Sequence, residues 1–144
     1  MGKTAFLFAG QGAQLPGMGK ELCEASPAAA AVFAAADSVR AGTSQQCFAG
    51  SQEELNRTIN TQPCVYCVDL AAARALEEAG IHPDAVAGFS LGEVAAMTFA
   101  GGFTDADGFS FVCYRAECMD YAAQRIPSGM VAVLKLDNET VEKI

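Results

Sequence analysis

Ser90 stands between two glycines, Gly88 and Gly92, where an apolar run gives way to a helical pattern in residues 85–102. A G-x-S-x-G pattern between a strand and a helix is typical of a nucleophile elbow, a tight turn that leaves the serine hydroxyl exposed. The N–H of Leu91 and the positive start of the following helix would stabilise a developing oxyanion. The spacing predicts that Ser90 is a nucleophile, and the alternative is a glycine-rich turn with an incidental serine.

A serine nucleophile needs a base to take its proton, and the chain contains one histidine, His82. His82 stands in the segment GIHPDA, which precedes the predicted strand leading to Ser90. It should therefore lie at the end of that strand opposite to Ser90. We expect a solvated turn residue there and not the base.

Arg115 is the second residue that indicates chemistry. The residues three and four positions away on its predicted helix are Phe111, Val112, Cys118 and Met119, so no carboxylate is spaced to pair with it. A planar guanidinium suits a carboxylate held by two hydrogen bonds. The pattern leaves two interpretations open: a ligand site, or an arginine that reaches solvent or pairs with an acid distant in sequence.

Short apolar runs alternate with helical patterns along the chain, which predicts an α/β fold with a parallel core. The first run is expected to be a strand buried on both faces. Predicted strands cover residues 3–9, 84–90 and 129–136, and predicted helices cover 20–26, 27–42, 51–58, 62–80, 91–102, 104–125 and the start of 137–144.

Capping signals support several of these boundaries. Pro27 suits a first helical turn, and Ser51 with Glu54 forms the pattern of a capping box. Thr104 with Asp107 three residues later marks the start of another helix. Residues 51 and 104 are therefore predicted helix N-caps.

Three strands make a narrow sheet for so many helices, and the last predicted helix has no stop signal. We expect the chain to be the N-terminal part of a larger domain. A missing C-terminal half is then an expected partner.

Composition excludes some classes of protein. The chain has 144 residues, 51% of them apolar, and a net charge of −8, which argues against nucleic-acid binding because phosphate contacts need a basic patch. It shows neither a signal peptide nor a membrane-spanning segment, so we expect a cytoplasmic protein with six reduced cysteines. Cys64 and Cys67 form a lone C-x-x-C, which we interpret as two small apolar residues on a buried helix face rather than a metal site.

Four motifs in consistent order resemble one family. They are FAGQGAQLPGMG at 8–19, TQP at 61–63, GFSLGE at 88–93 and YRAECM at 114–119. With them the chain resembles the malonyl-CoA:acyl carrier protein transacylases of fatty acid synthesis and the related acyltransferase domains of polyketide synthases. The resemblance runs along the whole chain.

The resemblance implies a role for each matched residue. Ser90 would carry the acyl group, and Gln11 would join the Leu91 amide in the oxyanion hole. Arg115 would hold the free carboxylate of the malonyl group, with Gln62 and Met119 near the same pocket. Leu91, next to the serine, resembles malonyl-selective members, whereas methylmalonyl-selective ones often carry glutamine there.

The implied reaction is ping-pong. A malonyl-serine forms from malonyl-CoA, and the phosphopantetheine thiol of an acyl carrier protein then takes the malonyl group. No metal or bound cofactor is implied, because coenzyme A is a co-substrate. The implied fold is an α/β-hydrolase-like core, here incomplete, over residues 1–125. Residues 126–144 would begin a small ferredoxin-like subdomain.

Two departures from the family pattern stand out. Phe89 replaces the usual histidine before the nucleophile, which predicts a changed pocket shape and not lost chemistry. The family's catalytic histidine comes well after the elbow and is missing from these residues, so the chain alone is expected to be inactive. Two alternatives remain: a serine esterase or thioesterase with the same elbow, or a non-catalytic acyl-binding fragment.

Overall fold

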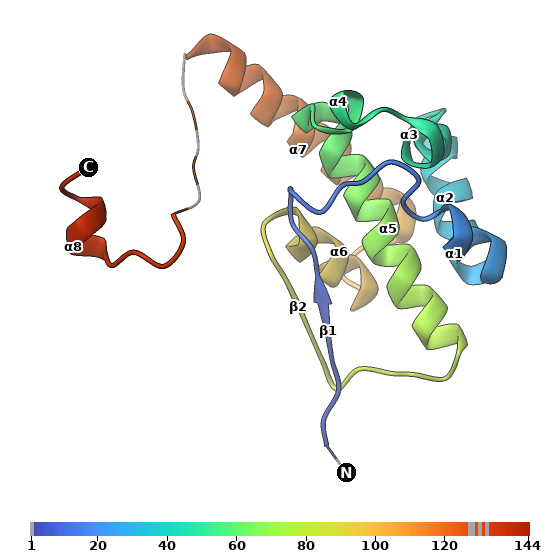
Figure 1. Ribbon diagram of the computed structural model, residues 1–144. Helices are drawn as coiled ribbons and strands as arrows, with labels where there is room; N and C mark the ends of the chain where they lie inside the picture. The colour runs from blue at the N-terminus through green and yellow to red at the C-terminus, as the bar shows by residue number, and fades with distance from the viewer. Residues whose placement is uncertain (1, 127–128, 130, 132) are drawn as a thin grey trace.

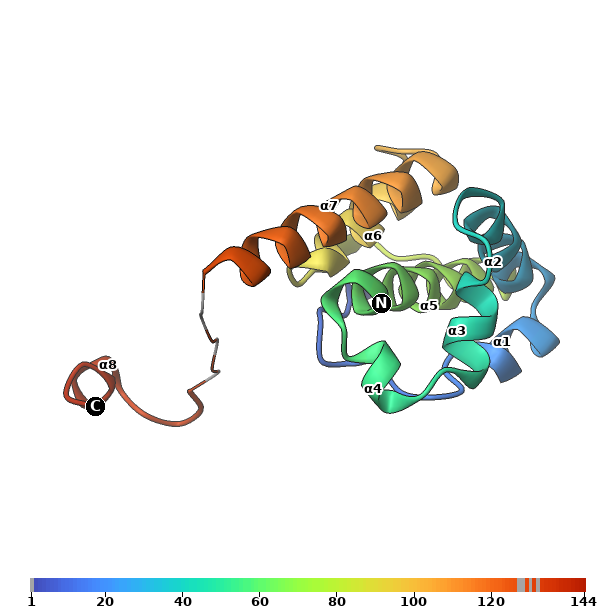
Figure 2. The same ribbon diagram turned by 90° about the horizontal axis from the view of Figure 1, so that it is seen from above.

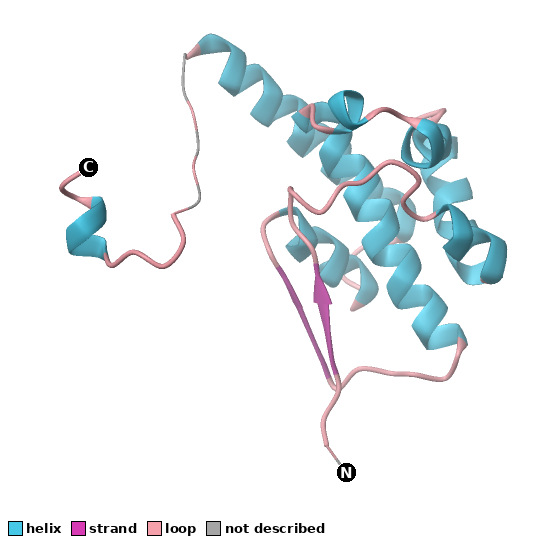
Figure 3. Ribbon diagram, in the orientation of Figure 1, coloured by secondary structure: helices cyan, strands magenta, loops and turns pink. Residues whose placement is uncertain are grey.

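The computed structural model describes residues 2–126, 129, 131 and 133–144 (Figure 1). Most of the chain is helical, with a small sheet (Figure 3). In chain order the elements are β1 (Ala5–Phe8), α1 (Lys20–Ala25), α2 (Pro27–Val39), α3 (Thr43–Ala49), α4 (Gln52–Leu55), α5 (Thr58–Glu78), β2 (Ala85–Gly88), α6 (Leu91–Phe99), α7 (Asp105–Arg125) and α8 (Asn138–Val141).

The sheet consists of β1 and β2, which pair in parallel with Ala5 opposite Ala85 and Phe8 opposite Gly88. The predicted α/β class with parallel pairing is therefore confirmed. The prediction that the first strand is buried on both faces is wrong, because Leu7 is 81% exposed. Phe6 and Phe8 point to the other face and pack against the ring of Phe99 in α6. The described helices thus cover one face of β1 and leave the other open.

The long helix α5 lies at the centre of the helical layer. It packs against α2, α6 and α7 and touches β1, and Figure 2 shows α6 and α7 lying alongside it. Its residues Cys64 and Cys67 are fully buried, as expected for apolar positions on a core-facing helix. Helix α6, which follows the predicted elbow, and β1, which pairs with the strand that precedes the elbow, therefore both contact α5.

Local signals placed the helix starts well. The Ser51 hydroxyl accepts a hydrogen bond from the N–H of Glu54, and the Thr104 hydroxyl accepts one from the N–H of Asp107. Pro27 is the first residue of α2. These caps form because a side-chain oxygen can satisfy an N–H group that the first helical turn leaves free.

Two helices differ from the prediction. Helix α3 has no counterpart in the prediction, which ends the preceding helix at Gly42. In the structure Gly42 has φ +85° and leads directly into Thr43. Helix α5 begins at Thr58, several residues before the predicted start, so Pro63 lies inside it. Burial of the first turns of α5 outweighs the low helix propensity of proline.

The predicted third strand, 129–136, falls partly outside the described residues. Its described residues, 129, 131 and 133–136, form no strand. Beyond them, Asp137 caps α8 by accepting a hydrogen bond from the N–H of Thr140, so the predicted helix start is confirmed. None of the described helices is long and apolar enough to cross a membrane.

Candidate active site

Ser90 lies in the turn between the end of β2 and the start of α6. Its backbone has φ 56° and ψ −109°, a region that residues other than glycine rarely adopt. Such a conformation costs on the order of 1–3 kcal/mol and is held only where the surrounding structure fixes it. The residue is exposed. The structure therefore has the sharp strand-to-helix turn that the G-x-S-x-G spacing predicted.

The two glycines of the motif are required by close backbone contacts. A Cβ on Gly88 would lie 2.1 Å from the carbonyl carbon of Gly92, and a Cβ on Gly92 would lie 2.3 Å from the carbonyl oxygen of Phe8. Helix α6 thus begins directly against the ends of both strands. A side chain at either glycine would push the helix away and displace Ser90.

Leu91 is the first residue of α6 and its side chain is fully buried. Its N–H is one of those that a helix N-terminus leaves without an acceptor within the helix. The N–H groups of Gly92 and Glu93 turn back to the carbonyl oxygens of Phe89 and Ser90. The Leu91 N–H next to the nucleophile is therefore suited to donate to an oxyanion.

Arg115 reaches Ser90 from the neighbouring helix α7. One guanidinium nitrogen, Nη2, donates a hydrogen bond to Ser90 Oγ at 3.0 Å. The other, Nη1, donates to the side-chain oxygen of Gln62 in α5. Among the described residues, no carboxylate lies within ion-pair distance of Arg115. The structure thus places an arginine without an acidic partner directly beside the elbow serine.

Gln62 and Met119 complete this cluster. Gln62 is fully buried, and its amide nitrogen donates to the sulfur of Met119 at 3.1 Å. The amide therefore presents its oxygen to Arg115. Four of the six predicted site residues, Ser90, Arg115, Gln62 and Met119, are joined by side-chain hydrogen bonds, and Leu91 adjoins Ser90.

Gln11, the sixth predicted residue, is exposed in the loop after β1. Its side-chain amide donates to Thr58 Oγ1 at 3.4 Å, and no hydrogen bond joins it to Ser90. The loop itself runs close to the elbow, since a Cβ on Gly10 would lie 2.5 Å from the ring of Phe89. Phe89 is 73% exposed. Gln11 is thus near the elbow through its loop, with its side chain directed to α5.

His82 lies at the opposite end of the strand, as predicted. It is exposed and belongs to the segment before β2, whereas Ser90 follows β2. It borders a surface hollow lined also by Pro83 and Phe99, and that hollow does not include Ser90. His82 therefore cannot serve Ser90 as a base in this arrangement.

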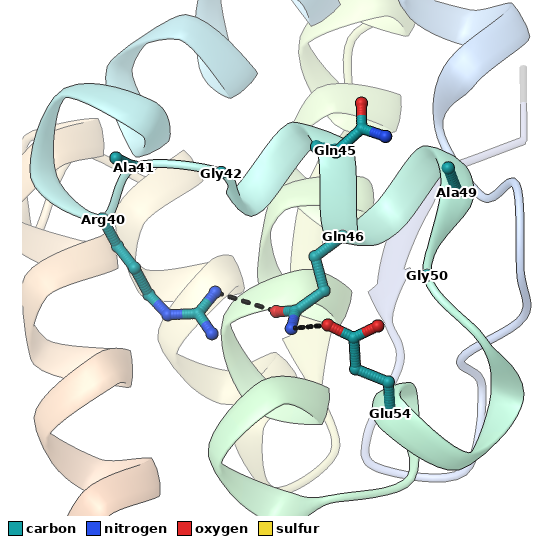
Figure 4. A pocket seen from close by; sticks show the side chains of 8 residues that line it. All are labelled: Arg40, Ala41, Gly42, Gln45, Gln46, Ala49, Gly50 and Glu54. Atoms are coloured by element: carbon teal, nitrogen blue, oxygen red, sulfur yellow. Dashed lines mark hydrogen bonds between the residues drawn. The ribbon is translucent and has the colours of Figure 1, made fainter.

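A polar cavity of about 370 Å³ lies apart from Ser90, between the end of α2, α3 and α4 (Figure 4). Arg40 donates to the side-chain oxygen of Gln46, whose amide donates to Glu54, as Figure 4 shows. Arg40 also donates to Asn60 in the first turn of α5, at 2.9 Å. This network braces the helix turn that precedes Gln62, and its arginine is occupied by neutral acceptors.

Asp69 of α5 is a half-buried acid beside the loop that carries Gln11. One of its carboxyl oxygens is enclosed without a hydrogen-bond partner, and the backbone N–H of Ala9, just before the Gln11 loop, donates to the carboxyl group. The hollow around it is lined by apolar residues of β1 and α5: Ala5, Phe6, Leu7, Phe8, Ala72, Ala73 and Leu76. Burial raises the pKa of Asp69 from 3.8 to about 7, although the Ala9 N–H lowers it in part.

This pKa predicts a pH-dependent stability. The folded state holds the Asp69 proton more tightly than the unfolded chain, so the stabilisation is fully present below about pH 4 and is lost as the pH rises through 7. In Asp69→Asn the side chain stays neutral. Between pH 5 and pH 8, the free energy of unfolding of Asp69→Asn should therefore fall by about 2 kcal/mol less than that of the original chain.

Urea unfolding of both proteins at the two pH values measures this difference. Glu53→Gln, an exposed acid in α4, is the matched control and should leave the pH dependence as it is. An unchanged pH dependence in Asp69→Asn would show that the Asp69 carboxyl titrates as in the unfolded chain.

Known proteins match this chain along its length. Residues 5–144 match the family model described as the acyl transferase domain. The malonyl CoA-acyl carrier protein transacylase of Bacillus subtilis (strain 168) is 41% identical over 145 residues, which cover 100% of this chain and 46% of the relative. The chain therefore spans about half the length of that relative.

Solved structures share the fold. The acyltransferase domain from the second module of the salinomycin polyketide synthase is 41% identical, with a TM-score of 0.78 over 83% of this chain and 29% of that chain. A malonyl-transacylase solved in complex with its type II polyketide synthase acyl-carrier protein is 33% identical, with a TM-score of 0.85 over 99% of this chain and 47% of that chain. The family match includes β1, the Ser90 elbow and the helix of Arg115, and the chain belongs to the acyl transferase domain family.

Proposed function

We propose that this chain carries the acyl-binding part of a malonyl-CoA:acyl carrier protein transacylase site. In this site Ser90 accepts the malonyl group and Arg115 holds its free carboxylate. The observation that carries the proposal is the 3.0 Å hydrogen bond from Arg115 Nη2 to Ser90 Oγ. It supports a site that recognises an anion at a short, fixed distance from the nucleophile.

The length of the malonyl group fits this distance. Once it is bound to Ser90 as an ester, its free carboxylate is separated from the ester carbon by a single methylene. An arginine that contacts the serine oxygen in the free protein needs only a small shift to reach that carboxylate. A longer diacid would carry its charge past the guanidinium, so the geometry favours the three-carbon acyl group.

Gln62 keeps the arginine in place during this exchange. Its oxygen binds Nη1 while Ser90 binds Nη2, so Nη2 is the nitrogen that a carboxylate would take from the serine. Because Gln62 is buried and its amide nitrogen is directed to Met119, its oxygen remains aimed at Arg115. The guanidinium plane is then fixed by a neutral partner that does not compete for its charge.

The proposed reaction has two halves. Ser90 Oγ attacks the thioester carbon of malonyl-CoA, the carbon–sulfur bond breaks, and the serine proton passes through a base to the departing thiolate of coenzyme A. The thiol of the carrier protein's phosphopantetheine then attacks the malonyl ester and returns a proton to Ser90. The Leu91 N–H, with Gln11 as the second proposed donor, stabilises the oxyanion in both halves.

The remaining parts of the proposal concern the assembly. The base is a group other than His82, the co-substrate is coenzyme A, and no metal or held cofactor takes part. Residues 1–125 form part of an α/β-hydrolase-like core, and 126–144 begin a ferredoxin-like subdomain that a C-terminal half would complete. The carrier protein in the complex of the related malonyl-transacylase supports an acyl carrier protein as the partner. The cytoplasm is the proposed location.

Covalent labelling of Ser90 tests the proposal on this chain. Because His82 cannot supply the base, the reaction mixture contains imidazole as a base in solution, together with malonyl-CoA. Intact-mass measurement should find one malonyl group per chain, and peptide mapping should place it on Ser90. Ser90→Ala should show no adduct.

The cysteines provide the check on this assignment. Cys118 is the exposed cysteine among the six, and it lies one turn from Arg115. Cys118→Ser should acylate like the original chain. An adduct that maps to a cysteine, or persists in Ser90→Ala, would contradict the nucleophile assignment. If an acyl-CoA with an uncharged acyl group, such as acetyl-CoA, labelled Ser90 as fast as malonyl-CoA does, the result would favour an esterase.

A further inference from the structure

The loop that carries Gln11 is held by side chains from outside the proposed site. Gln11, Gly12 and Ala13 are exposed, so no buried side chain fixes this turn of the chain. Gly12 also has φ +117°. Because glycine has no side chain, its backbone can change from this conformation to others at little steric cost. Hydrogen bonds must therefore determine the shape of residues 10–14.

Gln14 forms the bond that closes the turn. Its side-chain oxygen accepts the N–H of Gly12 at 2.8 Å, so the turn is bonded to its own side chain. The amide nitrogen of Gln14 then donates to Asn56 Oδ1 at 2.9 Å. The orientation of Gln14, and with it the bond to Gly12, depends on Asn56.

Asn56 is well placed to serve as a fixed point. It is the C-cap of α4, and its backbone N–H donates to the carbonyl oxygen of Gln52, while the next N–H, of Arg57, donates to that of Glu54. Its Oδ1 accepts a second side-chain bond from the amide nitrogen of Gln52 at 2.9 Å, and that nitrogen also lies 3.3 Å from the backbone oxygen of Gln14. One oxygen thus uses both of its lone pairs to join the loop to α4.

We propose that Asn56 is a positioning residue for the transacylase site: through Gln14 it fixes residues 10–14 and so presents Gln11 to the oxyanion at Ser90. This inference rests on the proposed function, because Gln11 acts as an oxyanion donor only in that reaction. A donor of this kind is effective when it is held in place before the reaction begins. Asn56 supplies that restraint without contacting the substrate.

The chemistry of the acceptor provides matched variants. Asn56→Ala removes the oxygen that both glutamine amides use. Asn56→Asp keeps an acceptor at the same position, so both bonds remain. Asn138→Ala, at the exposed start of α8, is the control for loss of an asparagine elsewhere.

Amide hydrogen exchange at Gly12, followed by NMR, reports on the turn itself. Loss of one hydrogen bond in the chain from Gly12 to Asn56 should speed exchange of the Gly12 N–H about fivefold in Asn56→Ala. Asn56→Asp and Asn138→Ala should exchange like the original chain. Unchanged exchange in Asn56→Ala would overturn the proposal.

Acylation of Ser90 in imidazole with malonyl-CoA reports on the reaction. In Asn56→Ala the limiting rate of acylation should fall by about the same factor, about fivefold, by which exchange of the Gly12 N–H rises. Asn56→Asp should keep the rate of the original chain. The malonyl-CoA concentration that gives half of the limiting rate should stay the same, because Asn56 does not touch substrate. Faster exchange with an unchanged acylation rate would also overturn the proposal.

The two measurements separate this inference from the proposed function. If the original chain forms no adduct on Ser90, the proposed function fails. The Gly12 exchange rates would then still decide whether Asn56 holds the turn. If the adduct forms and only the Asn56 effects are missing, the proposed function stands and the positioning role is wrong.

Discussion

Arg115→Ala is expected to slow acylation of Ser90 by malonyl-CoA roughly 10- to 100-fold, while acylation by acetyl-CoA stays the same or becomes faster. A hydrogen bond to a charged group contributes about 1.5–3 kcal/mol, and the malonyl carboxylate would lose such a bond. Acetyl has no carboxylate to lose. In the original chain, an acetyl group must also displace Arg115 from Ser90 Oγ and offers the guanidinium no carboxylate in return. Arg115→Ala removes that cost, so the acetyl rate should not fall.

The measurement compares initial rates of Ser90 labelling by the two thioesters in imidazole buffer. Arg125→Ala is the matched control, since it removes the same charge from the last turn of α7 and should change neither rate. Arg115→Lys keeps the charge but loses the planar pair of donors, so its malonyl rate should lie between those of the original chain and Arg115→Ala. Circular dichroism of each variant excludes unfolding as the cause. Equal losses for both acyl groups would show that Arg115 has a structural role.

The features that the sequence predicted well depend on local chemistry. The elbow follows from two glycines at fixed offsets from Ser90, and the helix starts at Ser51 and Thr104 follow from side chains that bond three residues ahead. The lack of an acid three or four residues from Arg115 was also informative, because the structure shows no ion pair to Arg115 among the described residues. In each case the relevant atoms lie within one helical turn of one another.

The features that the sequence did not predict depend on contacts between distant segments. Arg115 and Gln62 are 53 residues apart, and Gln14 and Asn56 are 42 apart, so no periodicity connects them. The family resemblance pointed to Gln62 but gave no sign of Asn56. Exposure of one face of β1 likewise depends on which elements lie over the strand, and the apolar residues of that strand do not determine it.

The remaining prediction concerns turnover. The 144-residue chain alone should show no multiple-turnover transfer of malonyl groups to an acyl carrier protein in a buffer without imidazole. A serine hydroxyl without a base is a poor nucleophile at neutral pH, and in serine hydrolases the oxyanion hole and substrate binding alone recover only part of the rate. The single histidine, His82, precedes β2 whereas Ser90 follows it, so it is too far away to take the proton.

Two variants show whether a base has been overlooked. Phe89→His should not restore turnover, because the side chain at this position lies over Gly10 in the loop after β1. His82→Ala should not change the labelling of Ser90 in imidazole buffer. Steady transfer by the chain without imidazole, lost in His82→Ala, would mean that β2 and α6 pack differently from the arrangement described. Because the glycine contacts at Gly88 and Gly92 leave little room for another packing, the expected result is labelling that rises with imidazole and is independent of His82.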